Sequence, residues 1–202
     1  AVAGDAAVAV TATDSEGNGA RGGNFILNAG DEAALLVGTN ALPLFDGAYA
    51  AFFGADILDI FGEQLPQGSS EFMNNGAGGL HAELTSTGGN VWLDVDGASA
   101  GGNTNNGFNI VMNALNGNIL GRFNEVDVLA NGGNGINLEL NGAGGALGFW
   151  FGDVLAANNG ANGINVVENY NGTVEIGGER IVSVNNTANG VRIVASGLAG
   201  LP

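Results

Sequence analysis

The 202-residue chain contains no cysteine, no lysine and only three prolines. Without cysteine there can be no disulfide framework, no thiolate nucleophile and no cysteine-ligated metal site. Long hydrophobic runs are also missing: none approaches the roughly 20 residues that a helix needs to span a bilayer. We therefore expect no insertion into a membrane.

Positive charge is scarce as well. Four arginines stand against 20 acidic residues, which gives a formal net charge of −16. Such a surface repels nucleic acids and anionic membranes, because phosphate binding depends on clusters of Lys and Arg. We therefore expect no nucleic-acid partner. Bound cations, or a salty medium that screens self-repulsion, suit this charge better.

Glycine and asparagine, in contrast, are abundant, and the chain has 38 glycines. Both residue types tolerate positive φ angles and therefore mark turns. Short segments of Val, Ile, Leu and Phe lie between them, a pattern typical of many short strands joined by tight turns. The hydrophobic content of 45% is too high for a disordered Gly-rich linker.

One motif recurs at an almost fixed interval: an Asn, three further residues, a Gly and then an apolar residue. The glycines are Gly79, Gly107, Gly135, Gly163 and Gly190. The asparagines, four residues earlier in each case, are Asn75, Asn103, Asn131, Asn159 and Asn186. A strand-and-turn pattern repeated in this way, here every ~28 residues, predicts a solenoid in which each coil stacks on the next.

Each repeat contains three predicted strands. The first strands, residues 80–84, 108–112, 136–140, 164–168 and 191–195, have one apolar face, and their other face carries His81, Asn109, Asn137, Asn165 and Arg192. The second strands are residues 91–95, 119–123, 147–151 and 174–176, and the third, less regular strands are 126–129, 154–157 and 181–184. Alternation with one apolar face predicts half-buried strands around an apolar interior.

The first third of the chain is less regular. We interpret the distance from residues 25–27 to Leu80 as about two coils, and residues 7–13 alternate as an opening strand would. Residues 48–61 fit either a distorted coil or a short helix. We predict one all-β domain over residues 1–202, with irregular coils in 1–73, regular coils in 74–196, and about seven coils in all.

The run from Ile181 to Ile193, with its relatives at residues 158–164 and 131–136, resembles the right-handed parallel β-helix repeat. That superfamily includes pectate-lyase-like enzymes, phage tailspikes and bacterial surface proteins. The resemblance implies a right-handed solenoid whose stacked turn asparagines form hydrogen-bonded ladders. Enzymes and non-enzymes share this fold, so the fold does not decide the function.

The outward face of the second strands carries the candidate ligand or partner residues. We expect Asp94, Arg122 and Trp150 in one column, beside Trp92 and Leu120 in the next. Two exposed Trp near an Asp–Arg pair are typical of a sugar-binding platform, but they equally suit a protein contact. In a purely structural interpretation, Asp94 and Arg122 form a surface salt bridge.

Catalytic chemistry has few candidates. For a lyase, the one set of acids and base is Asp94, Asp96 and Arg122, and the lack of lysine weakens it. A hydrolase pair, Glu83 and Glu139, would lie two coils apart. His81 has no partner pattern. We therefore name no catalytic residue.

One segment resembles half of a calcium-binding loop. Asp14, Glu16 and Asn18 supply oxygen donors and Gly19 allows the turn, but position 12 of the loop is Phe25, where a bidentate acid is expected. Otherwise the segment is a polar turn. No cofactor is required by the sequence, and Ca²⁺ is the one candidate.

The ends of the chain suggest association. The last regular strand is followed by a short segment without an amphipathic capping helix, and an uncovered terminal coil exposes backbone groups and core side chains. The start of the chain suits a mature secreted protein or a fragment. We expect an extracellular or cell-surface protein, structural or adhesive, that self-assembles end to end. The alternative is a domain that binds or degrades polysaccharides, with glycans as partners.

Overall fold

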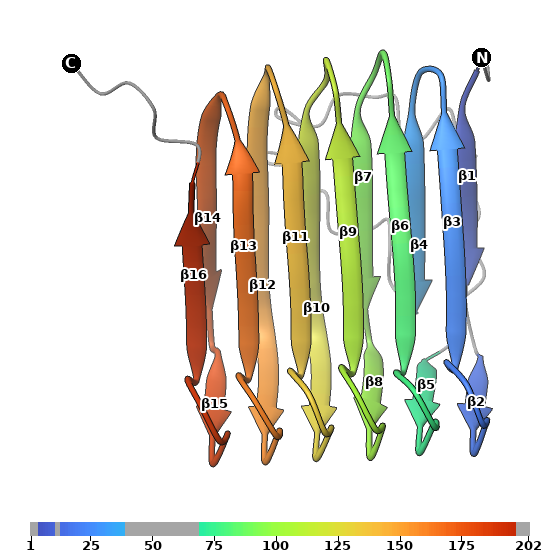
Figure 1. Ribbon diagram of the computed structural model, residues 1–202, viewed down its shortest axis with the longest axis vertical. Helices are drawn as coiled ribbons and strands as arrows, with labels where there is room; N and C mark the ends of the chain where they lie inside the picture. The colour runs from blue at the N-terminus through green and yellow to red at the C-terminus, as the bar shows by residue number, and fades with distance from the viewer. Residues whose placement is uncertain (1–3, 11–12, 39–68, 197–202) are drawn as a thin grey trace.

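The computed structural model describes residues 4–10, 13–38 and 69–196, and these form sixteen β-strands and no helix. In Figure 1 the chain rises along the front strands, passes over the top and descends behind, advancing from the N-terminal to the C-terminal side. This path is a right-handed solenoid with parallel strands. The predicted all-β fold is confirmed. None of the described residues belongs to a helix that could cross a membrane.

Two parallel sheets run the length of the solenoid. The long arm of the larger sheet is formed by β1 (Ala6–Val10), β4 (Ala33–Gly38), β7 (Val91–Asp96), the first halves of β10 (Ile119–Leu129) and β12 (Ala146–Ala157), and β14 (Thr173–Glu179). The short arm is formed by β2 (Asp14–Glu16), β5 (Ser70–Met73), β8 (Ala98–Gly101), the second halves of β10 and β12, and β15 (Val182–Val184).

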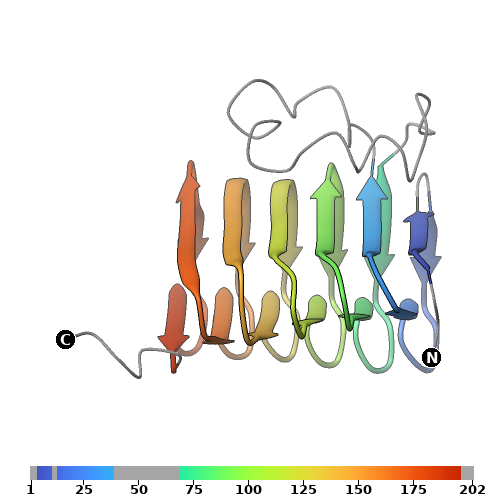
Figure 2. The same cartoon turned by 90° about the horizontal axis from the view of Figure 1, so that it is seen from above.

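The smaller sheet, which we call sheet B, supplies one strand to each coil. Its strands are β3 (Gly23–Ala29), β6 (Leu80–Ser86), β9 (Phe108–Ala114), β11 (Ile136–Gly142), β13 (Ile164–Tyr170) and β16 (Val191–Ala195). Each described coil therefore has three strand segments, as predicted, and the coils lie in layers (Figure 2). Equivalent positions stack in register: Ile136, for example, pairs with Phe108 on one side and Ile164 on the other.

The described residues form six coils, one fewer than predicted, and the difference lies at one corner. Where Gly97 alone separates β7 from β8, the chain between β4 and β5 runs from residue 39 to residue 69. No layer lies between the second and third coils, because β4 pairs directly with β7. The long connection is thus an insertion within the second coil.

The insertion also explains a wrong prediction of spacing. Gly23 pairs with Leu80, so β3 and β6 belong to adjacent coils. The sequence interpretation had placed residues 25–27 two coils from Leu80. The opening strand is present as β1, and the first two coils follow the register of the others. Residues 48–61, predicted as a coil or a helix, lie outside the described residues.

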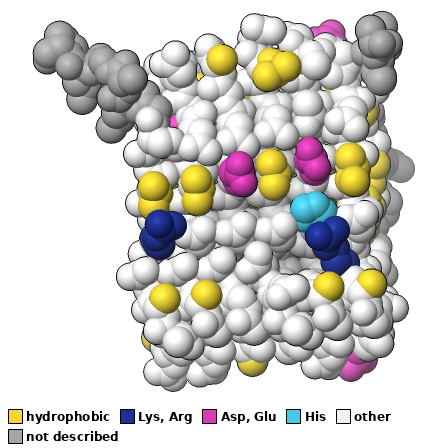
Figure 3. Space-filling view, in the orientation of Figure 1, with side chains coloured by type: hydrophobic (Ala, Val, Ile, Leu, Met, Phe, Trp, Pro, Cys, Tyr) yellow, Lys and Arg dark blue, Asp and Glu magenta, His cyan; other side chains and the backbone are white. Residues whose placement is uncertain are grey.

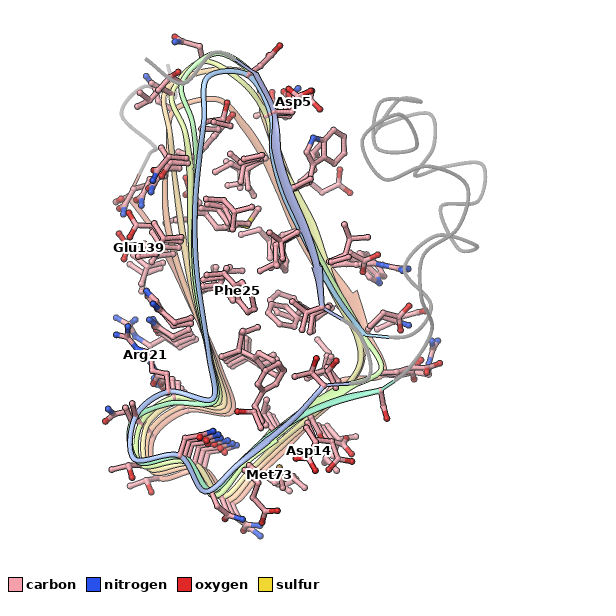
Figure 4. All side chains as sticks on the ribbon, turned by 90° about the vertical axis from the view of Figure 1, so that its right-hand side faces the viewer. Asp5, Asp14, Arg21, Phe25, Met73 and Glu139 are labelled. Carbon is pink, nitrogen blue, oxygen red and sulfur yellow. The ribbon has the colours of Figure 1, made fainter. Side chains whose placement is uncertain are left out.

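The interior is filled by the apolar side chains that alternate along the strands. Figure 4, which looks along the solenoid, shows Phe25 pointing inward and Arg21 and Glu139 pointing outward. Five phenylalanines form a continuous series of ring contacts: Phe72, Phe108, Phe123, Phe149 and Phe151. Glu168 departs from the apolar pattern with a charged group: it is buried, and its Oε1 accepts a hydrogen bond from the backbone N–H of Tyr170.

Candidate functional site

The predicted turn asparagines form a buried hydrogen-bond ladder at one corner of the solenoid. Asn131 illustrates its unit. Its Nδ2 donates to Oδ1 of Asn159 at 3.0 Å and to the carbonyl of Ala100 at 3.0 Å. Its own Oδ1 accepts from the backbone N–H and the Nδ2 of Asn103, at 3.3 and 2.9 Å. Each amide thus satisfies polar groups on two neighbouring coils, and the polarity of the ladder is the same throughout.

The ladder begins one coil earlier than the sequence analysis placed it. Asn18 donates through its backbone N–H and its Nδ2 to Oδ1 of Asn75, at 3.2 and 3.1 Å. The corner ladder therefore comprises Asn18, Asn75, Asn103, Asn131, Asn159 and Asn186. The long interval between Asn18 and Asn75 concealed the first of them. The Asn and Gly of the motif recur as Asn18 and Gly22, but Gly23 stands where the other repeats have an apolar residue.

This position of Asn18 bears on the predicted calcium loop. The Asn18 amide is engaged in the ladder, and Oε1 of Glu16 accepts from Nδ2 of Asn74 at 3.1 Å. Asp14 and Glu16 are exposed on β2. Among the described residues no three His, Asp or Glu side chains gather as a metal site. Calcium binding by Asp14, Glu16 and Asn18 stays a prediction.

The residue before each ladder asparagine has a left-handed backbone conformation. The φ angles are 68° for Gly17, 52° for Asn74, 64° for Gly102, 55° for Ala130, 58° for Asn158 and 55° for Asn185. Glycine and asparagine tolerate this region best, which explains the Asn-Asn and Gly-Asn pairs in the sequence. Ala130 is the one residue of this column that adopts the left-handed conformation although it is neither glycine nor asparagine.

The glycines of the motif allow close approach between coils. A Cβ on Gly135 would lie 2.6 Å from the carbonyl oxygen of Gly163, and a Cβ on Gly107 would lie 2.7 Å from that of Gly135. These distances are too short for any side chain. The predicted turn ladder is therefore a packing motif, in which Asn supplies hydrogen bonds and Gly supplies clearance.

A second ladder lies on the outward face of sheet B. Nδ2 of Asn109 lies 2.8 Å from Nδ1 of His81, Asn137 donates to Asn109, and Asn165 donates to Asn137, each at 2.8 Å. Arg192 donates to Asn165 at 2.8 Å. Figure 3 shows this face, with a row of acidic and apolar side chains beside the ladder. The sequence analysis had placed these residues at equivalent positions of successive coils, and their register confirms that they stack in one column.

The candidate face on the long arm has the predicted columns. Arg122 pairs in register with Asp94 on one side and Trp150 on the other, and Leu120 pairs with Trp92. Arg122 holds Asp94 with two bonds, Nε to Oδ1 at 2.8 Å and Nη2 to Oδ2 at 3.1 Å. The predicted salt bridge between these residues is therefore present.

The cluster extends beyond the predicted pair. Nη2 of Arg122 also lies 3.1 Å from Oδ2 of Asp96, and Nδ2 of Asn124 donates to Oδ1 of Asp96 at 3.0 Å. All four carboxylate oxygens thus accept a hydrogen bond. Asn124 was missed by the sequence analysis, although its place two residues after Arg122 puts it on the same face.

The face is not the exposed platform that the sequence analysis predicted. Trp92 is 3% exposed, Leu120 2% and Asp94 3%, so the prediction of two exposed tryptophans is wrong for Trp92. Both faces of β7 are buried, whereas the prediction assumed one outward face in water. Trp150 is half-buried, and its indole packs against Gly177, where a Cβ would lie 2.6 Å from the ring.

Burial changes the acidity of this cluster. Loss of solvation raises the pKa of Asp94 to about 6, because the energetic cost of burying the charge exceeds the stabilisation by Arg122. Arg122 is itself held by two carboxylates in geometry typical of bidentate pairing. To act as a general base or as a calcium ligand, a side chain needs a lone pair that is free, or a position that a substrate can reach. The geometry of these three side chains instead favours a structural role.

A polar hollow of about 200 Å³ lies on the outside of the solenoid near its N-terminal side. Its charged and polar lining comprises Arg21, His81, Asn105, Asn106 and Asn109. Burial, and then the charge of Arg21, lower the pKa of His81, so the imidazole is neutral at pH 7. Its Nδ1 accepts from the Asn109 amide, which leaves the proton on Nε2.

The last described coil exposes side chains whose equivalents are buried in the second to fifth coils. Val174, Val191 and Ile193 are 40%, 46% and 52% exposed. Their register partners in the fifth coil, Leu147, Ile164 and Val166, are at most 1% exposed. An apolar core surface is therefore open at the edge formed by β14, β15 and β16.

Comparisons with protein-family models, with curated proteins and with solved structures give no match to this chain.

Proposed function

We propose that this protein is an extracellular structural or adhesive β-solenoid that associates end to end into a fibre or surface layer. Within the right-handed β-helix superfamily, it would stand with the bacterial surface proteins rather than with the pectate-lyase-like enzymes. The observation that carries the proposal is the apolar edge of the last coil, where Val174, Val191 and Ile193 are exposed in the positions of core residues.

The distribution of polar side chains supports a structural role. The asparagines of the corner ladder and of the sheet B ladder are bonded mainly to one another, coil after coil. The charges of the Arg122 cluster are likewise paired, since Arg122 is bound by Asp94 and Asp96. Such an arrangement rigidifies a rod and leaves few groups poised for chemistry.

The charge of the chain supports a location outside the cell, at the cell surface or in a secreted layer. A net charge of −16 with no lysine makes copies repel one another at low ionic strength. External salt and divalent cations screen this repulsion. Association should therefore increase with ionic strength.

Sedimentation velocity over a range of protein and salt concentrations tests the proposal. We expect a growing population of oligomers as either concentration rises. A single sharp monomer peak, persisting at high protein concentration and high salt, would contradict the proposed function.

Carbohydrate binding is the second candidate, and the hollow beside Arg21 favours it. Guanidinium, imidazole and amide groups are the donors and acceptors that hold sugar hydroxyls and carboxylates, and here they converge on one concave surface. Isothermal titration with acidic and neutral oligosaccharides tests this role. Binding that is lost in Arg21→Ala and kept in Arg192→Ala would support it. Equal binding by both variants, or none by the unmodified protein, would reject it.

A further inference from the structure

The corner ladder has a direction, and its two ends are complementary. In every step the backbone N–H and the Nδ2 of one asparagine donate to Oδ1 of the asparagine in the following coil. At the first coil, Oδ1 of Asn18 therefore faces outward from the stack as an acceptor. At the last coil, the backbone N–H of Asn186 is the corresponding donor. A donor end and an acceptor end of one ladder can join.

The apolar side chains at the two ends also match by position. Strand β16 pairs in register with β13. A further coil stacked in the same register would pair with β16 and place its residues over Val191 and Ile193. The equivalent residues of the first coil are Gly23 and Phe25. Phe25 points inward and is half-buried. A first coil laid on a last coil would thus continue the core with a small residue over Val191 and a ring over Ile193.

The charges of the two edges do not oppose this contact. The acids of β2, Asp14 and Glu16, share their columns with Val182 and Val184 of β15. Arg192 of the last coil shares its column with Asn24 of the first. In these columns no carboxylate would stack on a carboxylate, in spite of the large net charge.

From these three observations we infer that a second copy of this chain is the partner of the open edge, and that its first coil adds in register onto the last coil of its neighbour. Strands β14, β15 and β16 pair in parallel with β1, β2 and β3 of the next copy, and Asn186 donates to Asn18 across the junction. This inference rests on the proposed self-association and specifies its geometry. Because the contact joins two different edges, it does not close and produces a filament.

Engineered cysteines test the register, since the chain has no native cysteine. Ile26 and Val194 occupy one outward column of sheet B at opposite ends of the solenoid. In the inferred junction their Cα atoms would be about 5 Å apart, which a disulfide spans. Within one chain they are five coils apart, about 24 Å, and cannot bond. The double variant Ile26→Cys/Val194→Cys should therefore form disulfide-linked multimers under mild oxidation.

Two matched variants serve as controls. Asn28→Cys/Val194→Cys shifts one partner by two residues along the strand, to about 8 Å, which exceeds the reach of a disulfide. Val167→Cys/Val194→Cys joins register partners of adjacent coils within one chain and should give an intramolecular bond. We expect multimers from the in-register pair at least tenfold more abundant than from the shifted pair.

The outcomes separate the two proposals. If sedimentation shows monomers only, the proposed self-association fails, and this geometry fails with it. If the protein assembles but the shifted pair cross-links as well as the in-register pair, or neither does while the intramolecular control does, the geometry is overturned and self-association stands.

A charge at the junction gives an independent measurement. Ile193 is already 52% exposed, so Ile193→Glu removes little of the core. It should raise the concentration needed for assembly at least tenfold. Leu115→Glu introduces the same charge at a residue that is also 52% exposed but lies between inner strands, β9 and β10, and should leave that concentration within twofold. Equal effects of the two variants would contradict the inferred junction.

Discussion

The corner ladder and the Asp94–Asp96–Arg122 cluster are both polar and buried, yet they are built on different principles. The ladder is neutral, and six coils repeat it with the same polarity. The cluster is charged, and two coils contain it. A neutral amide can be stacked without accumulating charge, so it extends along the whole solenoid. A buried ion pair must balance both charges at once, and among the described coils it has one place, because the ion pairs of Arg180 lie at the exposed surface.

The comparison predicts that the cluster is the more fragile of the two. Arg122→Met removes the guanidinium and leaves two carboxylates without their cation in a buried site. Breaking a buried pair in this way typically costs about 3–5 kcal/mol. We expect that loss in the free energy of unfolding, measured by urea denaturation at pH 7. Arg180→Met is the control, because Arg180 forms its ion pairs with Asp153 and Glu179 at the exposed surface, and a loss as large as that of Arg122→Met would contradict the account.

The cluster should also make stability depend on pH. The pKa of Asp94 is about 6 in the folded protein and 3.8 in the reference state, so the folded state binds the proton more tightly. The contribution of Asp94 is therefore fully present below pH 4, declines as the pH rises from about 4 to about 6, and is constant above that.

A shift of about two pH units corresponds to about 3 kcal/mol at most. Other acids titrate in the same range, so the informative quantity is the difference between the unmodified protein and Asp94→Asn. We expect the free energy of unfolding of the unmodified protein to fall relative to that of the variant between pH 4 and pH 6. Parallel pH profiles would contradict the raised pKa.

The ladder should respond to substitution at its centre by a smaller amount. Asn131→Ala removes the acceptor of the Asn103 donors and the donor to the Ala100 carbonyl. An unsatisfied buried polar group costs about 1–3 kcal/mol, and we expect a loss of about 2 kcal/mol. Asn137→Ala in the sheet B ladder is the matched control and should cost less than half as much, because water can replace its bonds. Equal losses would show that burial does not distinguish the ladders.

The smallest expected effect is a gain. Ala130 has a φ of 55°, and the equivalent residues of the first and third coils are Gly17 and Gly102. Ala130→Gly should relieve the left-handed strain and stabilise the protein by about 1 kcal/mol, although glycine also increases the entropy of the unfolded chain. Thermal denaturation measures the change, and a lower melting temperature would contradict the assigned conformation.

The stacking of coils in the regular half of the molecule could be predicted because every coil there contains the same turn motif at the same position. An Asn and a Gly four residues apart, followed by an alternating strand, recur once in every coil from Asn75 onward. The corner position of the asparagines and the inward faces of the strands followed directly from that regular interval.

The rest escaped prediction for two physical reasons. Residues 39–69 lengthen the interval between the strands of the first two coils in sheet B, which hid Asn18 and led to an extra coil. An interpretation based on alternation assumes that one face of each strand is in water, so Trp92 and Asp94 were expected at the surface. Strands β4 and β7 are instead buried on both faces. Burial of an outward face depends on what packs against it, and a strand's own sequence does not report that.

Electron cryomicroscopy of the concentrated protein in salt tests the central claim most directly. Six coils at about 4.8 Å each predict filaments with an axial subunit repeat of about 29 Å and strands perpendicular to the axis. Dispersed particles of one chain, or filaments with a different subunit repeat, would contradict it.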